Sequence, residues 1–169
     1  MALPRKLKNF LLFNDGENYI GQIAAVTLPK LSRKLEDWRG GGMDGATQAD
    51  MGQENIELQF TGGGVLDTAL KQYGVTKVDG CQLRFAGAYQ RDDTGDVDAV
   101  EVVVRGRHKE IDFGESKPGE NTEHKYTTAC SYYKLTFAGR VLIEIDLLNM
   151  IFIVDGVDRL AEQRRALGI

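Results

Sequence analysis

The chain of 169 residues is long enough for one domain with a hydrophobic core, since 42% of its residues are hydrophobic and 27% are charged. The formal net charge of -4 argues against a protein that binds nucleic acid phosphates, because such binding needs a basic surface. Twenty glycines and only three prolines exclude a collagen-like or proline-rich chain and predict many turns. We therefore expect a single domain that spans residues 1–169.

The first residues do not have the pattern of a targeting segment. Arg5, Lys6 and Lys8 precede a short apolar patch at residues 10–13, whereas a signal peptide needs a longer apolar core and a small-residue cleavage site. The most apolar region, Val141–Val154, is interrupted by acidic residues and does not have the composition of a membrane span. We expect the protein to be made and kept in the cytosol.

Alternation of apolar and polar residues is clearest in the segment 55–60, which reads NIELQF. Its apolar residues share one face and its polar residues, Asn55, Glu57 and Gln59, share the other, which predicts a half-buried strand. The segment 63–74 has apolar residues at helical spacing and ends at Gly74, which predicts a short helix.

The second half of the chain predicts two hairpins and a last helix. Strands 82–89 and 98–104 should pair through a turn at residues 93–95, and strands 127–137 and 139–146 through a tight turn at residues 138–140. The segment 156–169 has an apolar stripe, Asp158 near its start and two arginines near its end, as a helix dipole favours. The fold predicted is mainly β: an antiparallel β-sandwich or barrel with a flanking α-helix and a C-terminal helix.

Two long stretches, Leu31–Gly52 and Glu110–Glu123, show no period that predicts a helix or a strand. Both are polar and contain glycine. Loops of this length are unusual in a compact domain unless they have a function.

The glycine run in the first stretch, Gly40–Gly45, does not form a phosphate-binding loop. Such a loop needs a lysine and the start of a helix, whereas here Met43 and Asp44 follow the glycines and no helical pattern opens. A second run, at residues 62–64, again has no lysine and is better read as a strand-to-helix turn. We therefore expect no nucleotide site.

The residues that usually bind metals or perform catalysis are sparse or badly spaced. His108 and His124 have no partners at a metal-like spacing, so we expect structural or exposed histidines, and the acidic turn at residues 92–98 does not have the glycine and glutamate of a calcium loop. Cys81 and Cys130 are interpreted as two free thiols. We expect no enzyme activity, no cofactor, no metal and no small-molecule ligand.

A basic strip occupies alternate positions, Arg105, Arg107 and Lys109, so these side chains should share one face of a strand. Acidic residues follow it closely. The strip is either a solvated face or an interface with a neighbouring copy of the chain.

Ordered motifs along almost the whole chain resemble the major tail tube proteins of P2-like contractile-tailed phages, and the tube proteins of R-type bacteriocins are similar too. The motifs are LPRKLKNFLLFNDG (3–16), TLPKL (27–31), RGGGMDG (39–45), RFAGAYQRDDTG (84–95), VVRGRHKEIDFGE (103–115), YYKL (132–135), VLIEID (141–146) and GVDRLAEQRRALG (156–168).

The resemblance implies a tail tube domain with an N-terminal arm at about residues 1–16 and a long assembly loop at about residues 31–52. It also implies hexameric rings that stack into a tube inside a contractile sheath, as a part of the virion tail assembled in the host cytoplasm. The partners would be further copies of the chain, the sheath, baseplate and tail terminator proteins, and DNA that passes without specific binding. An acidic chain suits such a conduit, because a negative lumen repels phosphates.

The resemblance also suggests roles for particular residues. The long loop would contact another subunit through Trp38, Arg39, Gly40, Gly41, Gly42 and Met43. Trp38 either anchors that contact or packs on its own domain. Asn55, Glu57 and Gln59 are candidates for the lumen face, and the basic strip is a candidate interface.

Three other functions stay open at this point. The first is the tube of a headless R-type bacteriocin or a related contractile injection system. The second is a needle-tube component of a secretion system, and the third is a small β-barrel enzyme or ligand binder.

Overall fold

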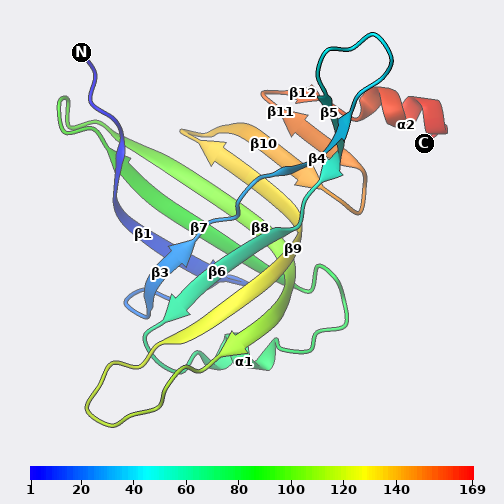
Figure 1. Ribbon diagram of the computed structural model, residues 1–169. Coiled ribbons are helices and arrows are strands. Elements are labelled where there is room, and N and C mark those ends of the chain that lie inside the picture. Colours follow the sequence, from blue (N-terminus) through cyan, green and yellow to red (C-terminus); the bar gives the residue numbers. More distant parts are fainter.

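The computed structural model covers residues 1–169 and confirms the mainly β, antiparallel fold that the alternation predicts (Figure 1). Ten strands form one sheet, β4 and β5 form a separate two-stranded sheet, and both helices are short. The elements are β1 Lys6–Asn14, β2 Glu17–Asn18, β3 Ile23–Thr27, β4 Arg33–Trp38, β5 Thr47–Gln53, β6 Ile56–Gly62, α1 Asp67–Lys71, β7 Cys81–Gln90, β8 Val97–Asp112, β9 His124–Phe137, β10 Arg140–Asp146, β11 Ile151–Val154, β12 Val157–Asp158 and α2 Ala161–Leu167.

The main sheet divides at β9. One edge of β9 pairs with β8 along most of its length, while the other edge pairs first with β6 and then, further along, with β10. The branch made of β3 and β6 faces β1, β7 and β8, and the hydrophobic core lies between them. β1, β6, β7, β8 and the first part of β9 contribute inward side chains at alternate positions, as a half-buried sheet requires; the fully buried ones include Leu12, Leu58, Phe60, Leu83, Val102, Val104 and Tyr126.

Both predicted hairpins are present. In the first, β7 pairs with β8 from Cys81 opposite Gly106 to Gln90 opposite Val97. In the second, β9 and β10 are joined at Ala138 and Gly139, which have φ values of 49° and 81°. Two consecutive positive φ angles match the twist of the strands in a two-residue hairpin turn, so the turn fixes the register of this pair.

In three places strands extend beyond the obvious alternation. β8 continues to Asp112 and β9 begins at His124, so the second unassigned stretch shortens to residues 113–123. Residues 31–52 are not a loop, since most of them form the β4–β5 hairpin. The N-terminal arm is also mostly a strand: β1 pairs with β7, and only residues 1–5 precede it.

Both helices are shorter than predicted. α1 spans Asp67–Lys71, and α2 begins at Ala161 because residues 157–158 pair with β11 as β12. Asp158 lies just before α2, accepts a hydrogen bond from the Leu160 amide and forms an ion pair with Arg164, which lowers the pKa of the Asp158 carboxyl. Neither helix has the length and apolar composition needed to cross a membrane.

The two cysteines are free and buried, as expected. Cys81 and Cys130 lie on opposite sides of Gly106, on the two strands that flank β8. Burial raises the pKa of both thiols to about 12, so neither is a reactive nucleophile at neutral pH.

Candidate functional site

The β4–β5 hairpin is well formed but buries none of its own residues. No residue between Leu31 and Gln53 is buried, and Trp38, Met51 and Leu35 have exposed fractions of 64%, 56% and 47%. Figure 1 shows the hairpin extending from the main sheet at the same end of the molecule as α2. An isolated two-stranded hairpin is only marginally stable in water, and here large apolar side chains of the hairpin are exposed in the single subunit.

The tip of this hairpin is a closed turn in which the side chains of Trp38 and Met43 both approach Gly40. The Met43 amide donates a hydrogen bond to the Gly40 carbonyl at 3.3 Å, and the Arg39 side chain donates to the Met43 carbonyl at 3.2 Å. A Cβ at Gly40 would lie 3.7 Å from Trp38 Nε1 and 3.8 Å from Met43 Sδ. The glycine run therefore forms a compact tip and is not an extended flexible arm.

The base of the hairpin is fixed to the C-terminal elements. The Arg33 guanidinium pairs with Asp50 at 3.0 Å, which lowers the pKa of the Asp50 carboxyl, and it also lies 5.1 Å from the centre of the Phe152 ring on β11. A cavity of about 430 Å³ lies between the hairpin base, the β10–β11 turn and α2, with Met51 and Leu160 among its lining residues.

The two predicted polar sets lie together on the outer face of the main sheet. Glu57 on β6 and Lys109 on β8 form an ion pair at 2.7 Å across the small side chain of Ala129 on β9, and Glu57 raises the pKa of Lys109. Arg107 donates to the Thr76 carbonyl at 3.3 Å. The negative charge that the sequence suggested for this face is therefore matched by a neighbouring lysine.

Arg105 completes the basic strip. Its guanidinium lies 3.9 Å from the centre of the Tyr132 ring, a cation–π contact on the same outer face. All three basic side chains of the strip thus have intramolecular contacts. Asn55 and Gln59 are exposed beside this group, as the alternation predicts.

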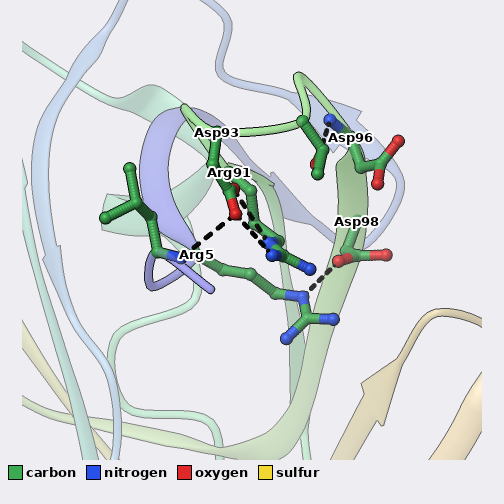
Figure 2. Close-up of polar contacts among 7 residues, drawn as sticks. Arg5, Arg91, Asp93, Asp96 and Asp98 are labelled. Atoms are coloured by element: carbon green, nitrogen blue, oxygen red, sulfur yellow. Dashed lines mark hydrogen bonds and ion pairs between the residues drawn. The ribbon is translucent and has the colours of Figure 1, made fainter. Parts of the chain in front are cut away.

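The N-terminal residues are held against the β7–β8 turn by contacts that the sequence analysis did not find (Figure 2). The Leu3 amide donates to the Asp93 carboxylate at 3.2 Å, and Arg5 forms an ion pair with Asp98. Arg91 binds Asp93 through two side-chain nitrogens, at 3.1 and 2.6 Å, and lowers the pKa of that carboxyl. Leu3 and Arg5 are about ninety positions away from Asp93 and Asp98 in the chain, so local spacing gives no signal for these two contacts.

Comparison with known proteins gives a match along the whole chain. The model of the family described as phage tail tube protein FII matches residues 4–168. The chain is 51% identical over 172 residues to the tail tube protein of Escherichia phage P2, with 100% of each chain covered. It is 44% identical over 158 residues to the major tail tube protein of Serratia phage KSP20, with 92% of this chain and 91% of that one covered.

Solved structures with the same fold have very low sequence identity. One is a chain of the sheath–tube complex of the PVC extracellular contractile injection system in its extended state, with a TM-score of 0.60 and 8% identity over 79% of this chain and 91% of that chain. Another is the tube-terminating cap of the anti-feeding prophage, with a TM-score of 0.62 and 9% identity over 82% of this chain and 94% of that chain. At these identities the likeness concerns the fold alone.

Proposed function

Because the chain belongs to the phage tail tube protein FII family, we propose that it is the repeating subunit of a tube made of stacked hexameric rings inside a contractile sheath. The family consists of structural proteins and not of enzymes. The observation that carries the proposal is the 51% identity to the P2 tail tube protein over the full length of both chains. The tube would be a part of the virion tail, assembled in the host cytoplasm, and would conduct the genome through the host envelope.

Two open edges of the main sheet support self-assembly. β3 pairs only with β6, and the residues of β1 before Phe13 pair only with β7. β3 reads IAAVT and has neither the charged residues nor the proline that usually protect an exposed edge. Two different open edges on one subunit allow head-to-tail contacts, which close into a ring when the rotation between copies is right.

The remaining partners follow from the same role. A sheath would surround the tube, a baseplate and a terminator would complete its two ends, and DNA would pass without a specific site. A headless bacteriocin or an injection system is the second candidate. The whole-chain identity to two phage proteins favours the phage, because the injection-system structures share only the fold.

Electron microscopy of the purified protein and of particles from its source tests the proposal. Tubes or rings formed by the protein alone are the expected result. Monomers that never assemble, in any concentration or salt and also with tail particles as nuclei, would contradict it. Particles with a capsid on the tail distinguish the phage from the headless alternative.

A further inference from the structure

Four polar side chains form a buried network beneath the segment that carries α1. Asn14 on β1, His108 on β8 and Thr128 on β9 have exposed fractions of 0%, 5% and 0%, and Gln72 reaches them from the end of α1. The network therefore joins three strands of the main sheet to the segment 63–80. Buried polar groups of this kind stabilise a structure only when each of them has a partner.

The hydrogen bonds fix the tautomer of the neutral His108 ring. Gln72 Nε2 donates to the Asp15 carboxylate and, at 2.9 Å, to Asn14 Oδ1, while Gln72 Oε1 accepts from Asn14 Nδ2 at 2.7 Å, so these contacts fix the orientation of the Gln72 amide. Gln72 Oε1 lies 3.0 Å from His108 Nε2, which must therefore carry a proton. His108 Nδ1 lies 2.9 Å from the Thr128 hydroxyl and accepts its hydrogen bond. The neutral imidazole is satisfied at both nitrogens, and a second proton on Nδ1 would force the Thr128 hydroxyl to turn and accept from it.

The surroundings of His108 are mostly apolar. The Phe60 and Tyr126 rings lie 6.2 and 6.3 Å from the centre of the imidazole. Burial lowers the pKa of His108, and the Asp15 carboxylate in the β1–β2 turn opposes this effect. Among the titratable groups around the network, Asp15 acts on His108, Tyr19 accepts from Asn14, and Tyr126 lies against the imidazole.

We infer that His108 is an acid-sensitive lock for the segment 63–80. When the ring gains a second proton, the Thr128 hydroxyl has to turn from donor to acceptor, and a charged imidazolium is buried at a position that is only 5% exposed. Loss of the hydrogen bond between His108 and Gln72 lets the imidazolium reach water, and the segment that carries α1 then separates from the strands it covers. The inference concerns the single subunit and does not depend on assembly into a tube.

Cys81 is an internal reporter for this opening, because it follows the segment directly and is only 1% exposed. The experiment measures labelling of Cys81 by dithiodipyridine between pH 8 and pH 5, relative to free cysteine at each pH, with mass spectrometry to separate it from Cys130. If the open state binds one more proton than the closed state, at His108, the fraction of open molecules rises as the pH falls. The labelling rate of Cys81 in the wild type should then increase by up to about tenfold per pH unit below about 6.5, the ordinary pKa of histidine.

Two variants make the result specific. His108→Gln should label at a rate that no longer rises in acid, whereas His124→Gln should behave as the wild type does. His124 is the matched control, because it is also buried, at 7% exposure, but contacts the Phe113 ring and not the network. An equal acid response in His108→Gln and the wild type would overturn the inference.

Hydrogen exchange of the wild type gives a second measurement that needs no variant. Amides of residues 63–80 should lose protection between pH 8 and pH 5, after correction for intrinsic exchange, while those of β7 and β8 keep it. Unchanged protection of the segment at pH 5 would also overturn the inference.

Discussion

Gly106 has no room for a side chain, because a β-bulge at Ser131 brings the backbone of β9 against it. A Cβ at this position would lie 2.0 Å from the Ala129 carbonyl oxygen, and backbone atoms cannot move aside as a flexible side chain can. Gly106→Ala should therefore lower the free energy of unfolding by about 3 kcal/mol. Urea denaturation measures this loss, with Gly41→Ala as the control, since nothing lies within 4 Å of a Cβ there. Equal stability of the two variants would contradict the argument.

Trp38 tests the assembly surface at the same scale. Because this side chain is 64% exposed in the subunit, Trp38→Ala should change the free energy of unfolding by no more than about 0.5 kcal/mol. It should nevertheless reduce the yield of tubes in sedimentation and electron microscopy, since a buried Trp is a common anchor of an interface. Tyr73→Ala, at a position that is 62% exposed outside the hairpin, is the matched control. If Trp38→Ala lowers the free energy of unfolding as strongly as it lowers the yield of tubes, Trp38 packs against its own subunit and is not an anchor of the interface.

The elements differ in how clearly the sequence predicts them. β6 and β7 are predictable because each buries one face and leaves the other at least partly exposed, so the period of two is visible. β4 and β5 were not predicted, because both of their faces are exposed and no apolar alternation arises. β1 has no local signal as a strand of the sheet, because its partner, β7, lies about seventy to eighty residues further along the chain.

The candidate site shows the same limit. The sequence pointed to Trp38 and Met43 through their contrast with polar neighbours, and the structure places them together at the hairpin tip. The contact between Glu57 and Lys109 depends on how three strands are ordered in the sheet. Local spacing carries no information on that order, so the two polar sets were assigned separate roles although they share one face.

The open edge of β3 allows a prediction at the scale of an element. Ala25 is exposed on this strand, so Ala25→Lys should leave the subunit folded while a charge at the edge opposes pairing with another strand. We expect thermal unfolding close to that of the wild type and a loss of rings and tubes in electron micrographs. Val65→Lys, at a 71% exposed position outside the strands, should assemble normally. Tubes of normal yield from Ala25→Lys would exclude this edge from the ring contacts.

At the scale of the whole molecule, the tube model requires that one polar face line the lumen while other surfaces join the subunits. The sequence suggested a lumen role for Glu57 and an interface role for Lys109. The two side chains form an ion pair on one face, so both residues should have the same role. The hairpin and the edge of β3 supply separate candidate contacts, which leaves the outer face of the sheet free for the lumen.

Reversal of the Glu57–Lys109 pair decides between these roles. If the face lines the lumen, Glu57→Lys should leave assembly intact and slow DNA passage, because it removes one negative charge and adds a positive charge beside Lys109, which together attract phosphates. The double variant Glu57→Lys with Lys109→Glu restores the balance of charge and should restore the rate of DNA ejection, measured by dye release from phage particles. If the face is an interface, the single variant should instead fail to form tubes, and the double variant should not recover them, because its swapped charges face the neighbouring subunit in reversed positions. Assembly of the single variant is therefore the measurement that separates a conduit wall from a subunit contact.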